Sequence, residues 1–135
     1  MEIGQELLYL LSAPEGNALN VLPVPALDRE VVRVLGKTRR YMEDHLADPL
    51  TIPALSRMAM LSATTFKDAF RRLYGLPVHA WLRQRRMERA TELLRDSSLS
   101  VLGIAQSVGY GSASQFTAAF RRQYGMTPAK YRKDV

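Results

Sequence analysis

The chain has 135 residues, of which 47% are hydrophobic and 24% charged, and its formal net charge is +6. This length suits one domain or two small lobes, and the hydrophobic content is too high for a disordered chain. The absence of cysteine excludes disulfides, thiolate metal sites and cysteine nucleophiles, and it fits a reducing cytoplasm, which is the location we expect.

The basic charge is concentrated in the later part of the chain. Residues 1–27 carry three acidic side chains and no basic one, whereas residues 51–135 contain 14 Lys and Arg against five Asp and Glu. Such a basic region is typical of a surface that binds a polyanion, although a basic surface without a partner would show the same balance. The apolar run at 7–11 is too short to cross a bilayer, so we expect no membrane partner.

Hydrophobic periodicity predicts helices along the whole chain, and the alternation typical of strands is absent. Residues 1–27 are expected to form a short leucine-rich helix followed by a proline-rich linker. A packing helix is expected over residues 28–47, because Asp28 can cap its start and Pro49 stops it.

Two pairs of short helices follow, separated by one long helix. The first pair is expected over residues 50–77, with Thr51 as N-cap and Gly75 as the C-terminal stop. The long helix is expected over residues 78–96, and the second pair over residues 100–133. The predicted fold class is therefore all-α: two helix-turn-helix subdomains joined by a long linker helix, preceded by an amino-terminal helix and linker.

The two helix pairs are copies of each other. Residues 66–75 ("FKDAFRRLYG") and 116–125 ("FTAAFRRQYG") match at seven of ten positions. Each copy has apolar residues on one face and polar residues on the other, behind a tight turn. An α-helix of this kind fits the major groove of DNA. The linker helix would be about 27 Å long, which together with its flanking turns could place two such helices about one DNA turn apart.

The turn differs between the copies. Met60 stands where the second copy has Gly109, and the second turn is one residue longer. If this position requires a positive φ, Met60 is strained there, and the first copy is weakened.

Three stretches resemble the DNA-binding region of AraC/XylS-type bacterial transcription regulators: "LSRMAMLSATTFKDAFRRLYG", "RRMERATELL" and "IAQSVGYGSASQFTAAFRRQYGMTPAKYR". The resemblance covers about residues 50–133. The helix at 28–46 and "LRQRRMERATELL" also resemble the siderophore-responsive subgroup related to the pyochelin regulator. The resemblance implies a sequence-specific regulator that inserts two recognition helices, at about 62–74 and 112–124, into adjacent major-groove segments of a promoter.

In full-length members of this family an amino-terminal domain senses a ligand or dimerises. Too few residues precede position 28 to form such a domain, so we expect a carboxy-terminal fragment, or a protein reduced to its DNA-binding part. The resemblance implies RNA polymerase as a partner of the DNA-bound protein. A small-molecule effector would act only through the missing domain.

The resemblance also nominates the residues that contact DNA. Base-reading side chains are expected two positions before, and one and two positions after, the anchoring phenylalanine of each copy: Thr64, Lys67 and Asp68, then Ser114, Thr117 and Ala118. The candidates for phosphate contacts are Arg71, Arg72, Gln115, Arg121 and Arg122. These arginines could equally be solvated or salt-bridged helix ends.

The chemistry of the two sets differs. Lys67 can donate to guanine O6 or N7, and Asp68 can accept from cytosine N4, but Asp68 could instead pair with Arg71 or Arg72 on its own helix. The second set is small and poor in donors, which suits phosphate, methyl or shape contacts. We therefore predict more direct sequence discrimination by the first copy. Arg86 matches an arginine of the family pattern and is expected to be a structural, internally bonded residue.

A protein-interaction function is the main alternative to DNA binding. The helical scaffold could contact RNA polymerase or another regulator and bind DNA only weakly. An enzymatic function has little support, because there is no nucleophilic cysteine, glycine-rich phosphate loop or metal cluster. Glu88 and Glu92 lie among arginines and are most simply an ion-pair face. We therefore predict a non-enzyme that needs no cofactor.

Overall fold

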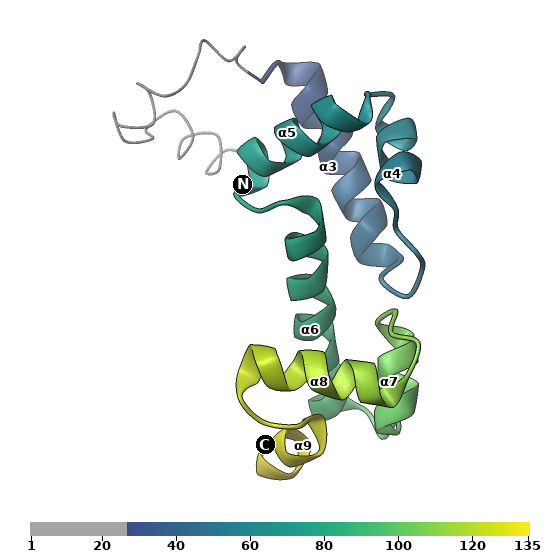
Figure 1. The fold of residues 1–135 in the computed structure, drawn as a ribbon, viewed down its shortest axis with the longest axis vertical. Coiled ribbons are helices and arrows are strands. Elements are labelled where there is room, and N and C mark those ends of the chain that lie inside the picture. The colour runs from purple at the N-terminus through teal and green to yellow at the C-terminus, as the bar shows by residue number, and fades with distance from the viewer. Residues whose placement is uncertain (1–26) are drawn as a thin grey trace, which may run out of the picture. The chain divides into compact units, whose positions relative to one another are not determined.

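The computed structural model describes residues 27–135, and this part of the chain forms helices only. The predicted helix and linker at 1–27 lie outside the described residues except for the last position. In chain order the helices are α3 (Arg29–Asp44), α4 (Ile52–Ala59), α5 (Ala63–Tyr74), α6 (Val78–Asp96), α7 (Val101–Ser107), α8 (Ala113–Tyr124) and α9 (Pro128–Asp134) (Figure 1). The all-α prediction is confirmed.

The described residues divide into two compact units. Unit 1 contains residues 27–41 and 51–78, and unit 2 contains residues 42–50 and 79–135. The end of α3 and the loop after it therefore group with the second helix-turn-helix, although they precede the first in sequence. A side chain of α6 accounts for this grouping, as described below.

Unit 1 is built around the contact between α4 and α5. Its buried apolar side chains come from α3, α4, α5 and the first residue of α6: Leu35, Leu55, Ala59, Phe66, Ala69, Phe70, Leu73 and Val78. The aromatic rings of α5 lie along one face and are tilted against one another, with 5.9 Å between the ring centroids of Phe66 and Phe70 and 4.8 Å between those of Phe70 and Tyr74. The guanidinium of Arg39 lies 5.6 Å from the Tyr74 centroid, which suits a cation–π contact.

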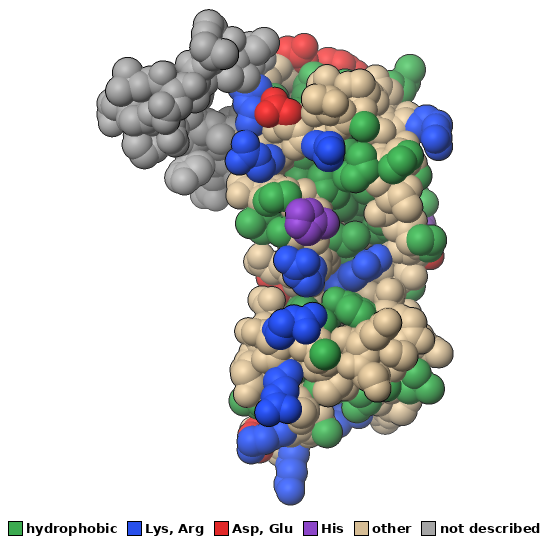
Figure 2. Space-filling model, in the orientation of Figure 1, with side chains coloured by type: hydrophobic (Ala, Val, Ile, Leu, Met, Phe, Trp, Pro, Cys, Tyr) green, Lys and Arg blue, Asp and Glu red, His purple; other side chains and the backbone are tan. Residues whose placement is uncertain are grey.

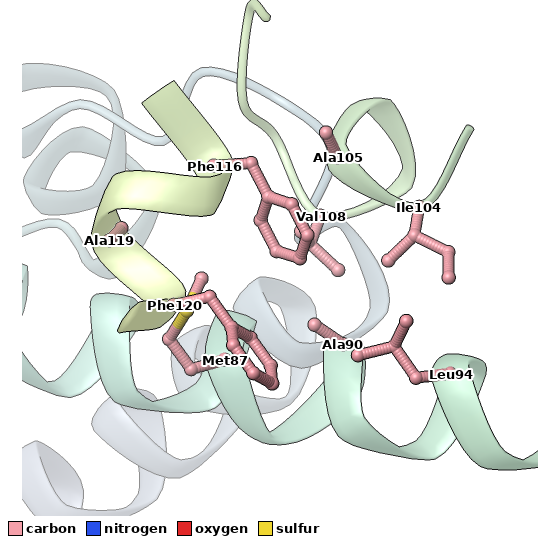
Figure 3. Packing of buried hydrophobic residues seen from close by; sticks show 9 residues of the cluster. All are labelled: Met87, Ala90, Leu94, Ile104, Ala105, Val108, Phe116, Ala119 and Phe120. Atoms are coloured by element: carbon pink, nitrogen blue, oxygen red, sulfur yellow. The ribbon is translucent and has the colours of Figure 1, made fainter. Parts of the chain in front are cut away.

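Unit 2 repeats this packing around α6. Met87, Ala90 and Leu94 of α6 face the apolar side chains of α7 and α8 (Figure 3). The ring centroids of Phe116 and Phe120 lie 5.8 Å apart, and those of Phe120 and Tyr124 lie 4.7 Å apart. These spacings match those of unit 1, so the sequence duplication is also a duplication of core packing.

Side-chain hydroxyls start most of the helices. In each case the oxygen accepts a hydrogen bond from the backbone N–H three residues later, which satisfies one of the donors left free at a helix start. The donor–acceptor distances are 3.3 Å at Thr51, 3.1 Å at Ser62, 2.9 Å at Ser100, 3.1 Å at Ser112 and 3.2 Å at Thr127. Asp28 caps α3 in the same way, at 2.8 Å from the Val31 nitrogen.

The turns inside the two helix pairs follow the same backbone path at their start. The Leu61 N–H donates to the Ser56 carbonyl at 3.0 Å, and the Tyr110 N–H donates to the Ala105 carbonyl at 2.9 Å. The residue before each donor is left-handed, with φ of 60° at Met60 and 89° at Gly109. The position therefore does require a positive φ, and Met60 is the only non-glycine residue with one among residues 27–135.

Candidate nucleic-acid interface

The first recognition helix, α5, presents one polar stripe. Thr64, Lys67, Asp68 and Arg71 are all exposed, and their spacing of three and four residues places them on one side of the helix. The opposite side carries the buried phenylalanines of unit 1. The cap at Ser62 fixes where the helix begins, so the stripe is held at a defined position relative to the turn.

The second recognition helix, α8, presents the equivalent stripe with smaller side chains. Ser114, Ala118 and Arg121 are exposed, and Thr117 is half-buried. A shallow depression on the surface is lined by Ala113, Ser114, Thr117, Ala118, Arg121 and Arg122. The structure thus brings most of the predicted second set together on one surface. Gln115 is also exposed, and its backbone N–H is held by the Ser112 cap.

The arginines at the ends of the two helices have different surroundings. Arg72 lies 3.6 Å from the Asp68 carboxylate, one turn earlier on α5, and its side chain is only 26% exposed. In α8 the position of Asp68 is occupied by Ala118. Arg122 is exposed, and among the described residues neither it nor Arg121 forms an ion pair. Of the two possibilities for Asp68, the structure shows the ion pair within its own helix.

Arg85 and Arg89 of α6 form ion pairs inside unit 2. Arg85 contacts Glu43 at 3.6 Å and Glu88 at 2.7 Å, and Arg89 contacts Glu92 at 2.8 Å. The two carboxylates of α6 are therefore ion-pair partners of neighbouring arginines, as the sequence indicated.

Arg86 fastens the loop before α4 to α6. Its Nε donates to the Leu46 carbonyl at 2.9 Å, and its terminal nitrogen donates to the Asp48 carbonyl at 2.8 Å. Burial lowers the pKa of this guanidinium, and the nearby Tyr110 opposes the shift. The structural role predicted for Arg86 is confirmed, and these bonds explain why residues 42–50 group with unit 2.

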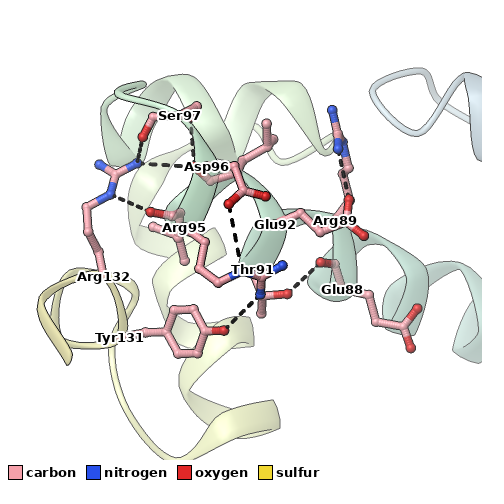
Figure 4. A network of polar contacts seen from close by, with 11 residues as sticks. Glu88, Arg89, Thr91, Glu92, Arg95, Asp96, Ser97, Tyr131 and Arg132 are labelled. Atoms are coloured by element: carbon pink, nitrogen blue, oxygen red, sulfur yellow. Dashed lines mark hydrogen bonds and ion pairs between the residues drawn. The ribbon is translucent and has the colours of Figure 1, made fainter. Parts of the chain in front are cut away.

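Arg132 performs the same task for the loop before α7, and no sequence pattern indicated this role. From α9 it donates to the carbonyls of four residues at and beyond the end of α6: Leu93 at 3.4 Å, Leu94 at 3.0 Å, Ser97 at 3.2 Å and Leu99 at 2.7 Å (Figure 4). Beside it, Arg95 reaches the Tyr131 hydroxyl at 3.4 Å. Each helix-turn-helix is thus preceded by a loop that an arginine holds in place.

In the view of Figure 2 many Lys and Arg side chains of the described residues are visible, and acidic ones are few. No helix among residues 27–135 is long and apolar enough to cross a membrane. In the same residues no group of three or more His, Asp and Glu could hold a metal ion.

Comparison with known proteins identifies the family. A sequence model described as a helix-turn-helix domain matches residues 55–134. The chain belongs to the AraC family. This is a family of DNA-binding transcription regulators rather than of enzymes.

Two curated relatives show how much of an AraC-family protein the chain represents. It is 34% identical over 130 residues to the transcriptional regulator ExsA of Pseudomonas aeruginosa, covering 96% of the chain and 45% of ExsA. It is 31% identical over 128 residues to the virulence regulon transcriptional activator VirF of Yersinia enterocolitica, covering 95% of the chain and 46% of VirF. The chain therefore spans less than half the length of these relatives.

Solved structures confirm the fold. The DNA-binding domain of the global transcriptional factor AdpA, determined in complex with a target DNA, is 33% identical with a TM-score of 0.71, covering 74% of this AraC-family chain and 90% of that domain. The carboxy-terminal domain of AraT, a response regulator from Geobacillus stearothermophilus, is 26% identical with a TM-score of 0.73, covering 82% and 89%.

Proposed function

We propose that this chain is the promoter-binding part of a bacterial transcription regulator, and that α5 and α8 each enter a major-groove segment of double-stranded DNA. The observation that carries the proposal is the repeated polar stripe. Both helices place the same four positions on the side opposite a buried aromatic face: all four are exposed in α5, and in α8 three are exposed and Thr117 is half-buried.

The proposal assigns chemistry to these positions. Thr64, Lys67 and Asp68 of α5, and Ser114, Thr117 and Ala118 of α8, face the base edges, because an α-helix fills the major groove and its outward side chains reach the bases. Arg71, Arg121 and Arg122 neutralise phosphates at the groove edges, with Gln115 as a hydrogen-bonding partner. Arg72 could bind a phosphate only if its ion pair with Asp68 is broken.

Two kinds of support stand outside the chain itself. AdpA, whose DNA-binding domain shares 33% identity with this chain, was solved with a target DNA. ExsA and VirF carry the names of transcription regulators. By analogy with the family, the bound protein would position RNA polymerase at the promoter, and an effector would act through a separate ligand-sensing domain.

The experiment that tests the proposal is a selection of random duplex DNA by this chain at near-physiological salt, followed by sequencing. Two enriched blocks about one helical turn apart are expected, because two recognition helices would read two groove segments. Affinity for the selected site should fall steeply as salt increases, since phosphate neutralisation releases counterions.

The control uses charge changes of equal size. Arg121→Ala should weaken binding and reduce the salt dependence, whereas Lys133→Ala, an exposed site at the end of α9, should change neither. Retention of DNA without enriched blocks and without salt dependence would contradict the proposal. That result would favour the alternative in which the scaffold contacts RNA polymerase or another regulator.

A further inference from the structure

We infer that the two recognition helices differ in their role: α5 discriminates between base pairs, mainly through Lys67, while α8 binds phosphates through Arg121 and Arg122 and discriminates little between bases. This inference rests on the proposed function and names the sequence feature that the protein selects. It predicts an asymmetric DNA site in which one block contains a required guanine and the other is degenerate.

The first observation is the ion pair within α5. The Asp68 carboxylate and the Arg72 guanidinium lie 3.6 Å apart, so the carboxylate has a cationic partner on its own helix that competes with cytosine amino groups. Lys67 is exposed on the same stripe and forms no ion pair among the described residues. Lys67 is therefore the strong hydrogen-bond donor that α5 leaves available to a base edge.

The second observation is the lack of both groups in α8. The positions of Lys67 and Asp68 are occupied by Thr117 and Ala118, so the stripe offers one hydroxyl where α5 offers an ammonium and a carboxylate. Without a carboxylate one turn earlier, Arg122 stays exposed, in contrast to the half-buried Arg72. The two substitutions thus remove base-reading groups from α8 and release a cation for phosphates.

The different side chains of α5 and α8 imply different base preferences. A lysine in the major groove donates to guanine O6 and N7, which no other base pair presents as two adjacent acceptors. Hydroxyl and methyl groups discriminate weakly, and contacts from arginines at a helix end to phosphates carry no base information. The guanine preference should therefore belong to the α5 block alone.

A residue exchange between the helices tests the inference directly. K67T/D68A should reduce the preference for guanine over the other bases by about tenfold in one block and leave the other block unchanged. T117K/A118D should create a second guanine in the block that is degenerate for the unaltered chain. All four positions lie on the surface stripes, and circular dichroism confirms that each variant is folded.

Salt dependence tests the attachment role separately. R122A should lower the slope of log K against log salt by about 0.9, because one phosphate contact is lost. K130A/D134A removes the ion pair within α9 at constant net charge and should leave the slope unchanged. Equal changes for the two variants would overturn the assignment of Arg122.

The outcomes separate this inference from the proposed function. If two blocks are enriched but K67T/D68A does not relax a guanine, or if α8 variants relax base identity as strongly as α5 variants, the difference in role between α5 and α8 is wrong and DNA recognition stands. If no variant and no salt condition alters retention, the proposed function itself fails.

Discussion

Gly109 is a residue that cannot be replaced without moving the backbone. A Cβ at this position would lie 2.6 Å from the Leu46 carbonyl oxygen and 2.8 Å from Cζ of Arg86, and its φ of 89° disfavours any other residue. Gly109→Ala should therefore lower the free energy of unfolding by about 3 kcal/mol or more, which urea denaturation can measure.

Gly125 is the matched control. It has a φ of 78°, but a Cβ there meets nothing within 4 Å. Gly125→Ala should cost only about 1 kcal/mol, which is the backbone penalty alone. An equal decrease in the free energy of unfolding at the two glycines would mean that the close approach of Leu46 and Arg86 to position 109 does not affect stability.

Met60 allows the opposite experiment at the equivalent turn. Its φ of 60° costs about 1–2 kcal/mol in a non-glycine residue, and its side chain is 89% exposed, so little burial is lost on removal. Met60→Gly should raise the free energy of unfolding by up to about 1 kcal/mol after the entropy of glycine is subtracted, which appears as a higher urea midpoint at unchanged m. A lower midpoint would show that the Met60 side chain contributes packing that outweighs the strain.

The side chain of Arg132 joins α9 to the end of α6. Arg132 bonds to four carbonyls at and beyond the end of α6, and its loss would leave partly buried acceptors without these donors. Arg132→Ala should cost about 3 kcal/mol in urea denaturation, and Arg132→Lys should recover only part of it, because an ammonium lacks the planar fork. Lys133→Ala, one residue on, should stay within about 0.5 kcal/mol of the unaltered chain.

The positions of several helices could be predicted from the residues that begin and end them. The caps at Asp28 and Thr51 and the glycine at 75 are local signals, and each is used in the structure as predicted. Arg132 was missed because the carbonyls it binds lie 33 to 39 residues earlier, at a distance where periodicity carries no information. For Asp68 the sequence left base contact and ion pairing open, since both suit an exposed carboxylate one turn before an arginine.

Residues 27–135 contain two hydrophobic cores, one in each unit. Phe120→Ala should destabilise unit 2 by about 3–5 kcal/mol, because a fully buried ring is lost from a packed cluster. Hydrogen exchange should then accelerate in α7 and α8 while the amides of α4 and α5 keep their protection. Phe70→Ala is the mirror experiment, with acceleration expected in α4 and α5. Equal acceleration in both units after either change would show a single cooperative core.

At this scale the sequence predicted two helix-turn-helix copies but could not show which flanking residues belong to each. Residues 42–50 read as the tail of a helix that precedes the first copy. Their grouping with unit 2 depends on two hydrogen bonds from Arg86, about 40 residues later in the chain. Such pairings depend on tertiary geometry, which no local pattern encodes.

The attachment of residues 42–50 to unit 2 has a consequence for protein engineering. Because the backbone passes from one unit to the other three times, the copies cannot be separated by a single cut. A chimaera that takes its second helix-turn-helix from another family member should include that protein's counterparts of both residues 42–50 and residues 79–135. A graft that starts at α6 would take the residue at position 86 from the other protein but keep residues 42–50 of this chain. The hydrogen bonds between that residue and the loop would then join two sequences that did not evolve together.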